Sequence, residues 1–345
     1  HLWKKCSDNP CVEDPFNSYG ICYDNEFSQG VTCSQRYDCI SPASNGVFSL
    51  KDDCVFSADS VKVMGELSIV GKEVKYTKIT NAKFIIPMHG TISTPRMKIK
   101  WLNMTGSQTI WSGGVILLHG GSLIVSNSIF CFNSAFEMGG AIASHKHAYR
   151  HTIHLTNVIF ISNSAGEMEN LNASTHTVVG IGGALYLTKA IVFVNDCQFL
   201  NNVAKSLGGA VTIYTNNTSV YFTRVIFQEN MQIDMETNFQ NNTGGGAIAS
   251  LHSSGAKQVA SNVITFRECT FTRNEATGPG HQIKILGVQP SIINTKFVNV
   301  AASKNFYSNL EPTLKIKNCS HSLCTAPPFT GQCKNRDTIE YGVTC

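Results

Sequence analysis

The chain has 345 residues, of which 42% are hydrophobic and 14% charged, and its formal net charge is +4. This hydrophobic content can fill a core and excludes a disordered chain, while the small net charge gives no reason to expect a nucleic-acid partner. No apolar run approaches the ~18 residues that cross a membrane, so we expect no transmembrane segment. Because the chain opens at His1 without an initiator Met or a signal peptide, we expect a processed or trimmed product.

Residues 1–54 are rich in cysteine and form the first predicted unit. Their cysteines lack the close pairs of zinc sites, which favours disulfides formed in an oxidising compartment and leaves a metal site as the alternative. The disulfide candidates of this unit are Cys6, Cys11, Cys22, Cys33, Cys39 and Cys54.

Residues 55–318 are predicted to form one β solenoid, which starts before its regular repeat does. Residues 61–70 and 97–102 alternate between apolar and polar side chains, the pattern of half-buried strands. We interpret residues 55–112 as the first coils. Residues 281–318 have a similar strand-like pattern, and we interpret them as the closing coils.

Between residues 113 and 280 one phrase recurs: Phe-x-x-Asn-x-Ala, a few residues, then Gly-Gly-Ala and an aliphatic residue. A basic unit of about 26 residues, with insertions at 166–179 and 231–242, explains the spacing of the copies, and such periods are typical of solenoids. The segments between the turns are short and β-rich, so each copy reads as one coil of an all-β parallel β-helix. We expect about eight to ten coils, stacked ~4.8 Å apart.

Each motif residue has a predicted role in this coil. The Phe side chains would stack inward in a column, and the Asn side chains would bond to their counterparts in neighbouring coils and take the left-handed conformation of a corner. Gly-Gly would form a second corner with no room for a Cβ, and the following Ala would fill a narrow inward position. The predicted turn and ladder residues are Asn133, Asn163, Asn202, Asn230, Asn274, Gly140, Gly183, Gly209 and Gly246.

The pairing of Phe-x-x-Asn with Gly-Gly-Ala-Ile, as in Phe130 to Asn133 followed by Gly139 to Ile142, resembles the repeat of the chlamydial polymorphic outer-membrane proteins. The resemblance covers roughly residues 113–280. It implies a right-handed, pectin-lyase-like β-helix, of the kind linked in that family to adhesion and surface display.

Three isolated cysteines, Cys131, Cys197 and Cys269, lie within the predicted solenoid. Cys197 and Cys269 both precede a motif Phe by two positions and therefore share a column, with Val225 between them. Two coils separate them by ~9.6 Å, which is beyond the reach of a disulfide. We expect buried thiols that pack as small hydrophobic side chains.

Residues 319–345 form the third predicted unit and repeat the cysteine pattern of the first. Both copies begin Cys-Ser-x-x-x-Cys, continue with Pro-Phe and close on Gly-Val-Thr-Cys. We interpret the chain as one period of a tandem array, in which a small disulfide-rich module alternates with a solenoid. Duplicated caps on a single solenoid are the alternative. The disulfide candidates here are Cys319, Cys324, Cys333 and Cys345.

Asn-x-Ser/Thr sequons permit N-linked glycans on a secreted eukaryotic protein, although their number is close to chance in a chain so rich in Asn, Ser and Thr. The glycosylation candidates are Asn103, Asn172, Asn216, Asn217, Asn241 and Asn318.

A glycan-active enzyme on this scaffold would need carboxylates clustered on one face. From Ser60 to Asn318 the only aspartates are Asp196 and Asp234. Glu137, Glu167 and Glu169 fall in predicted turns or insertions. We therefore expect no catalytic residues and no cofactor.

Four histidines are the candidate metal ligands: His145, His147, His151 and His154. His145 and His147 would share a strand face and could hold copper or zinc. No acidic or cysteine partner accompanies them, so we prefer a polar hairpin insertion and predict no metal site. Trp101 and Trp111 could stack on sugars, but we expect them in the core.

Together these features predict a non-catalytic structural protein in the extracellular space or on the cell surface. It would be the rigid repeat unit of a filament, an appendage or a surface adhesin, with further copies of itself as partners through self-association or tandem repetition. A carbohydrate-active β-helix enzyme, a polysaccharide lyase or hydrolase, or a glycan-binding adhesin is the alternative.

Overall fold

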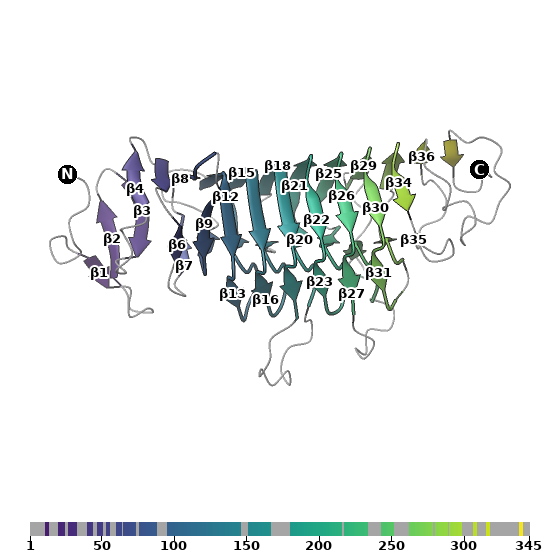
Figure 1. Ribbon diagram of the computed structural model, residues 1–345, viewed down its shortest axis with the longest axis horizontal. Helices are drawn as coiled ribbons and strands as arrows, with labels where there is room; N and C mark the ends of the chain where they lie inside the picture. Colours follow the sequence, from purple (N-terminus) through teal and green to yellow (C-terminus); the bar gives the residue numbers. More distant parts are fainter. Residues whose placement is uncertain are drawn as a thin grey trace.

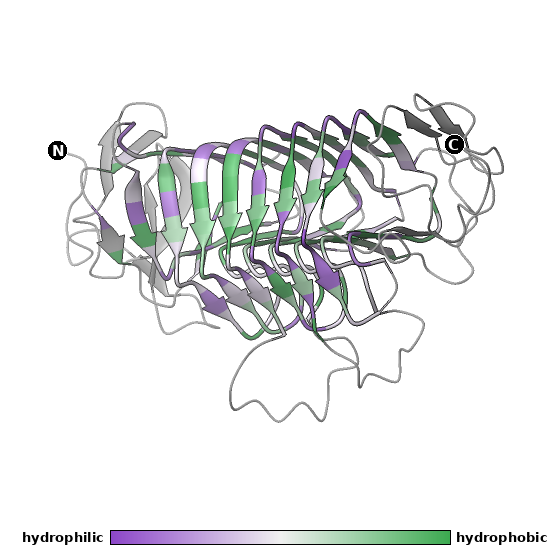
Figure 2. Ribbon diagram, turned by 45° about the vertical axis from the view of Figure 1, so that its right-hand side comes forward, coloured by the Kyte–Doolittle hydropathy of each residue, from purple (hydrophilic) through white to green (hydrophobic). Residues whose placement is uncertain are grey.

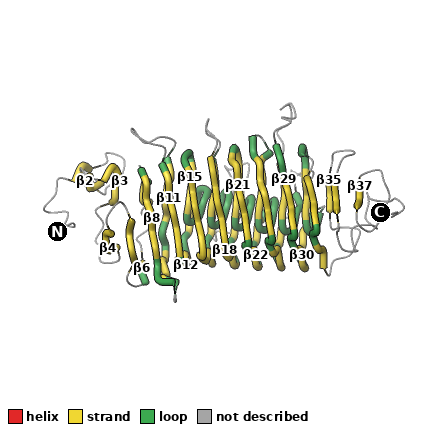
Figure 3. Tube along the Cα trace, turned by 90° about the horizontal axis from the view of Figure 1, so that it is seen from above, coloured by secondary structure: helices red, strands yellow, loops and turns green. Residues whose placement is uncertain are grey.

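The computed structural model describes the chain from residue 53 to residue 298 with gaps, together with eight short strands outside this range. The stretches left out between 53 and 298 are 56–59, 64, 74–75, 88–94, 146–150, 167–179, 216, 234–242, 252–261, 279 and 289. The described elements are all strands, and they wind in coils along one long axis (Figures 1 and 3). The predicted all-β fold with parallel sheets is therefore confirmed.

One sheet, here called the Gly-Gly sheet, contains the strands that follow the Gly-Gly motifs. Its nine strands pair in parallel, and each opens one coil, so we number the coils 1 to 9 by these strands. In order they are β7 (Ser60–Lys62), β10 (Lys83–Ile86), β14 (Ile116–Leu118), β17 (Ile142–Ser144), β20 (Leu185–Thr188), β24 (Val211–Tyr214), β28 (Ile248–Leu251), β32 (Ile283–Ile285) and β35 (Phe306–Ser308).

The second sheet, the broad sheet, takes a leading and a trailing strand from most coils. The leading strands are β5 (Val47–Leu50), β8 (Glu66–Val70), β11 (Arg96–Lys100), β15 (Ser122–Cys131), β18 (His151–Ile161), β21 (Ala190–Asn195), β25 (Ser219–Thr223), β29 (Ile264–Arg267), β33 (Pro290–Ile293) and β36 (Lys315–Lys317). The trailing strands are β6 (Cys54–Val55), β9 (Thr77–Thr80), β12 (Leu102–Thr105), the second halves of β15 and β18, β22 (Gln198–Leu200), β26 (Ile226–Gln228), β30 (Thr270–Thr272) and β34 (Lys296–Val298).

The third sheet, the short sheet, closes the cross-section with strands of two residues. They are β13 (Gln108–Thr109), β16 (Ser134–Ala135), β19 (Ser164–Ala165), β23 (Val203–Ala204), β27 (Met231–Gln232) and β31 (Glu275–Ala276). Because β27 pairs in register with β23, the insertion predicted at 231–242 begins too early: Met231 and Gln232 belong to the coil itself.

The register between coils repeats motif by motif, so Phe130 lies opposite Phe160, and Phe160 opposite Phe199. In the broad sheet, buried residues alternate with half-buried or exposed ones, which puts every second side chain in the core, and hydrophilic and hydrophobic residues share single strands (Figure 2). The core is a continuous column of Ile, Val, Leu and Phe that runs from Leu50 to Phe297.

Two columns of left-handed residues bend the chain within the coils. The φ angles of the non-glycine residues in both columns lie between 45° and 59°. One column separates the leading and trailing strands: Trp101, Asn127, Asn157, Asp196, Arg224, Glu268 and Asn294. The other precedes the ladder position: Asn81, Gly106, Phe132, Ser162, Asn201, Glu229 and Arg273. The expectation that the ladder Asn is itself left-handed is wrong, because the residue before it makes the bend and leaves the Asn side chain free to point into the core.

The ends of the chain contribute antiparallel strands. β1 (Cys11–Glu13), β2 (Gly20–Asp24) and β3 (Phe27–Thr32) form a small sheet in which Cys11 lies opposite Cys22 along the backbone. β4 (Ile40–Ala43) pairs with β5, and β37 (Thr338–Glu340) pairs with β36. Since β5 already pairs in parallel with β8, the coils take up residues before 55. The three-unit division and the disulfides stay predictions. Of the ten disulfide candidates, all but Cys11, Cys22 and Cys54 lie outside the described residues.

Candidate interaction surface

The motif phenylalanines form one inward stack through coils 3 to 8. Neighbouring ring centroids are 4.8–5.1 Å apart and the rings are nearly parallel. In coils 1 and 2 the same column holds Ile79 and Met104. The stack follows directly from the strand register, because a parallel coil-to-coil spacing of ~4.8 Å is also a favourable distance between rings.

The five ladder asparagines are fully buried in a neighbouring column. Asn202 is typical: its Nδ2 donates to Oδ1 of Asn230 at 2.9 Å and to the carbonyl of Phe160 at 3.0 Å. Its Oδ1 accepts from both the amide and the backbone nitrogen of Asn163. The ladder begins at the backbone nitrogen of Ser107 and ends at Gln282. The side-chain amides of these five asparagines are therefore all bonded, which a low-dielectric core requires.

The Gly-Gly motif is required by contact between coils. A Cβ on any of the four predicted glycines, Gly140, Gly183, Gly209 or Gly246, would lie 2.1 Å from a backbone oxygen of the next coil. The glycine before each of them has a positive φ, from 58° to 74°. Neither position can therefore accept a side chain without moving the backbone.

A second buried layer lies on the outside of the Gly-Gly sheet, and the sequence reasoning missed it. Leu117, Ala143, Tyr186 and Ala249 face outward there, yet they are buried under Met138, Ile181 and Leu207. The sequence holds a signal for this layer, because a large apolar residue directly precedes three of the Gly-Gly pairs. These residues are Met138, Ile181 and Leu207. In this layer burial raises the pKa of the Tyr186 phenol well above its usual value.

Lys284 occupies the same outward column in coil 8, next to Ala249. It is only 1% exposed, and its Nζ donates to the carbonyl of Thr243 at 2.6 Å. Burial lowers the pKa of this amine to about 8.

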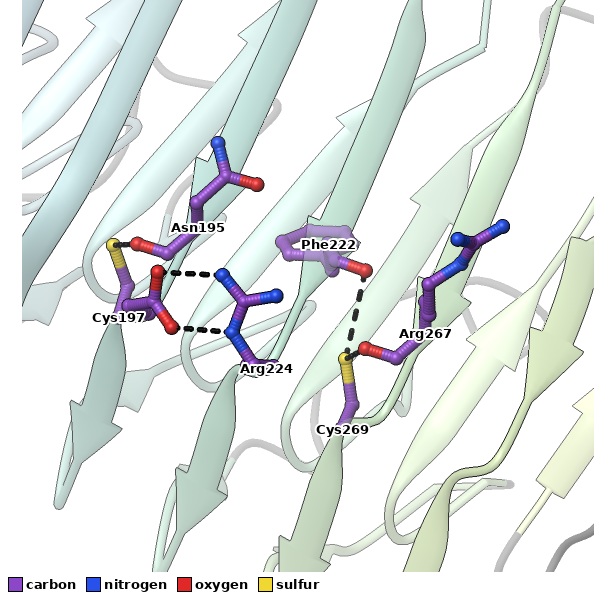
Figure 4. A network of polar contacts seen from close by, with 7 residues as sticks. Asn195, Cys197, Phe222, Arg224, Arg267 and Cys269 are labelled. Atoms are coloured by element: carbon purple, nitrogen blue, oxygen red, sulfur yellow. Dashed lines mark hydrogen bonds and ion pairs between the residues drawn. The ribbon is translucent and has the colours of Figure 1, made fainter.

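The three inner cysteines are free and buried, in agreement with the expected thiols. Cys197 donates to the carbonyl of Asn195 and Cys269 to the carbonyl of Arg267 (Figure 4). Val225 lies between their coils and is fully buried. Burial raises the pKa of both Cys197 and Cys269 to about 12, so neither is a reactive thiolate.

The carboxylates do not come together. Asp196 is exposed and accepts two hydrogen bonds from the Arg224 guanidinium, at 2.6 and 2.8 Å. This partner lowers the pKa of the Asp196 carboxyl. Glu137 accepts from Ser112 Oγ at 3.2 Å, while Asp234, Glu167 and Glu169 lie outside the described residues. Within the described ranges no three His, Cys, Asp or Glu side chains gather as metal ligands would.

The histidines are spread over different strands. His145 follows β17, where its ring lies 5.3 Å from that of His119, a neighbour that the sequence reasoning did not find. His151 is buried at the start of β18, with Nε2 3.1 Å from the carbonyl oxygen of His145. His154 faces outward on the same strand, and His147 lies outside the described residues.

The candidate sugar-stacking and glycan sites differ in exposure. Trp111 is 53% exposed, so its expected place in the core is wrong, whereas Trp101 is half-buried at a bend. Asn103 is half-buried on β12 and accepts from the Cys131 thiol at 3.1 Å. Asn217 is exposed in a turn. The remaining sequons, Asn172, Asn216, Asn241 and Asn318, lie outside the described residues.

The outer face of the broad sheet is nearly uncharged in coils 3 to 6. On strands β15, β18, β21, β22, β25 and β26 and the bends between them, the only charged residues described are Asp196 and Arg224, which pair with each other. A row of outward rings crosses this face. His154 stacks on Phe193 at 4.9 Å, and Phe193 on Tyr221 at 5.2 Å. Hydroxyl and amide side chains flank the row, among them Thr156, Asn195 and Thr223.

The same face becomes cationic in coil 2. Arg96, Lys98 and Lys100 all point outward from β11, and Lys100 Nζ lies 3.7 Å from the ring centroid of Trp101. The broad outer face thus divides into a cationic strand and a neutral, partly aromatic field beside it.

Comparison with known proteins gives one partial similarity. The chain is 31% identical over 201 residues to the probable autotransporter YfaL of Escherichia coli K12. The match covers 53% of this chain but only 14% of that protein, so the chain spans about a seventh of its relative's length. No family model and no solved structure matches the chain. Among the described residues, no helix is long and apolar enough to cross a membrane.

Proposed function

We propose that this protein is a rigid β-helix rod that works outside the cell or on its surface as a structural or adhesive element, without catalysis. The observation that carries the proposal is the unbroken ladder of Phe and Asn side chains through coils 3 to 7. Such a ladder fixes each coil to the next along the whole axis. The partial similarity to a probable autotransporter supports the location.

The finer features belong to the same proposal. Repeats like those of the chlamydial polymorphic outer-membrane proteins, disulfide-rich modules at both ends, N-linked glycans and assembly by self-association or tandem repetition would together make a filament, appendage or adhesin. The nearly uncharged outer face of coils 3 to 6, where Asp196 and Arg224 pair with each other, supports assembly, because interface cores are depleted of charged residues.

Electron microscopy and small-angle scattering of the purified chain test the rod. Nine coils predict a body with an axis of roughly 43 Å before the end modules are added, and particles longer than one chain would support assembly. A compact sphere would contradict the rod, and a monodisperse monomer at all concentrations would contradict self-association.

A glycan-binding adhesin is the second candidate, favoured by the outward ring row and the cationic strand. A polysaccharide-active enzyme stays the alternative to both. Incubation of the full chain with acidic polysaccharides, with and without Ca²⁺, followed by a reducing-end assay separates them. Turnover would overturn the non-catalytic proposal, and binding without turnover would favour the adhesin.

A further inference from the structure

The strand β11 presents a row of cations on the outer face of coil 2. Arg96, Lys98 and Lys100 alternate with Met97 and Ile99, which are 0% and 1% exposed. Residues two positions apart in a strand are ~6.7 Å apart, so the row from Arg96 to Lys100 extends roughly 13 Å along β11. The burial of Met97 and Ile99 fixes the backbone, which leaves the three charges in a set order and spacing.

Little negative charge opposes this row. The register places Glu66, Ser68 and Val70 on one side of it and Ser122, Ile124 and Ser126 on the other. Of these six residues only Glu66 is charged, and it accepts a 2.5 Å hydrogen bond from Lys98 Nζ. Lys98 lowers the pKa of the Glu66 carboxyl, which therefore stays ionised. Three cations and one anion leave a local excess of positive charge.

An aromatic ring closes one end of the row. Trp101 has a left-handed backbone, and its ring lies under the Lys100 ammonium. Its backbone is held on both sides, because its N–H donates to the Ser126 carbonyl of coil 3 and its carbonyl accepts from the Thr77 N–H of coil 1. Ring, ammonium and guanidinium are the groups that recognise a sugar carrying an anionic substituent.

We propose that the β11 row, Arg96, Lys98 and Lys100 with Trp101, binds an anionic extracellular polysaccharide through its carboxylate or sulfate groups. The proposal rests on the extracellular location in the proposed function. A polysaccharide fits better than a nucleic acid, which needs a longer basic track. The neighbouring strand β15, which places Ser122 and Ser126 beside Arg96 and Lys100, is uncharged. A polysaccharide with spaced anions can therefore meet the cations while its hydroxyls face serine and threonine side chains.

Binding of the full chain to immobilised heparin and polygalacturonate, measured at low and at physiological ionic strength, tests this proposal. Neutral dextran and single-stranded DNA serve as comparison ligands. We expect binding to one or both acidic polysaccharides that weakens as salt is added, and none to dextran. Heparin alone would identify sulfate as the ligand chemistry, and polygalacturonate alone would identify carboxylate.

A pair of double variants with equal change in net charge locates the site. Arg96→Ser with Lys100→Ser should weaken binding about tenfold or more. Arg267→Ser with Lys296→Ser should change it less than about twofold, although Arg267 faces outward in the same column as Lys100. Glu66→Gln, which frees Lys98, should strengthen binding about two- to fivefold. Circular dichroism confirms that each variant keeps its β structure.

Three results would overturn the proposal: no binding to either acidic polysaccharide, equal loss in both double variants, or equal binding of single-stranded DNA with the same dependence on β11. None of these results bears on the proposal that the protein is a rigid rod, because the shape of the rod is measured independently. Failure of this inference is therefore distinguishable from failure of the proposed function.

Discussion

Coils 3 to 7 and coils 1 to 2 share one backbone path but differ inside and outside. The central coils carry the Phe stack and the Asn ladder within, and an outer face that is nearly uncharged through coil 6. In coil 2 the ladder position is Ser107 and the ring position is Met104, while the outer strand carries three cations. From coil 2 to coil 6, interior regularity and outer charge therefore occupy different parts of the solenoid.

This difference separates stability from recognition. Identical side chains stack only where neighbouring coils repeat, so the ladder gains from repetition and fixes the sequence of the central coils. Coils 1 and 2 need only a packed apolar core, which leaves their outer positions free to vary. The proposed polysaccharide site lies there, and the central coils serve as its rigid support.

The largest expected effect comes from breaking the coil-to-coil contact of the central region. Gly209→Val would place a Cβ 2.1 Å from the carbonyl oxygen of Gly246 and should lower the free energy of unfolding by about 5 kcal/mol or prevent folding. Thermal and urea denaturation measure it. Gly106→Asn is the control in coil 2, because Asn81 and Asn201 hold the same left-handed position; it should cost about 1 kcal/mol or less. Equal losses would contradict the comparison.

A somewhat smaller loss is expected when one rung of the ladder is removed. Asn202→Ala removes the acceptor of two buried nitrogens of Asn163 and one donor each from Asn230 and Phe160, so we expect a loss of roughly 4 kcal/mol in unfolding free energy. Asn157→Gly removes an exposed amide contact to Asn127 at a left-handed position and should change stability by about 0.5 kcal/mol. If the two variants unfolded at the same urea concentration, the ladder would have no special role.

Lys284 extends the comparison to coil 8 and predicts a pH dependence. Its folded pKa of about 8 lies below the ordinary value of 10.5, so between these two pH values the unfolded chain binds more protons. Stability should therefore rise with pH across this window, by at most about 3 kcal/mol. Below pH 8 both states are charged and the burial penalty is complete. Lys284→Met should abolish this rise in urea titrations from pH 7 to 10.5; an unchanged rise would exclude Lys284 as its source.

The smallest effect concerns the inner thiols of coils 5 and 7. With pKa values of about 12, Cys197 and Cys269 are about one part in ten thousand thiolate at pH 8. Iodoacetamide should leave both unmodified in the folded protein and label both after unfolding, as peptide mass spectrometry can show. Rapid labelling of either one in the native state would mean that the central coils open more easily than the ladder allows.

Much of the interior could be predicted from the sequence. The Phe and Asn of the repeat fall in the core columns that the motif predicts, and the glycines face the backbone of the next coil. The left-handed positions could not be predicted, because residues as different as Phe132, Ser162 and Glu229 hold them. Asn holds five of the fourteen bend positions but does not mark them all, so the strands on either side impose these bends.

The sequence by itself determined the chain's division into coils, since a repeated motif can satisfy its hydrogen bonds only by stacking on its own copies. Its composition, 42% hydrophobic residues with a formal net charge of +4, does not show where the charged side chains lie in the folded protein. Only the tertiary structure decided that Arg96, Lys98 and Lys100 stand beside an uncharged field, and that Lys284 is buried. Both depend on the register between coils, which joins residues that are far apart in the chain.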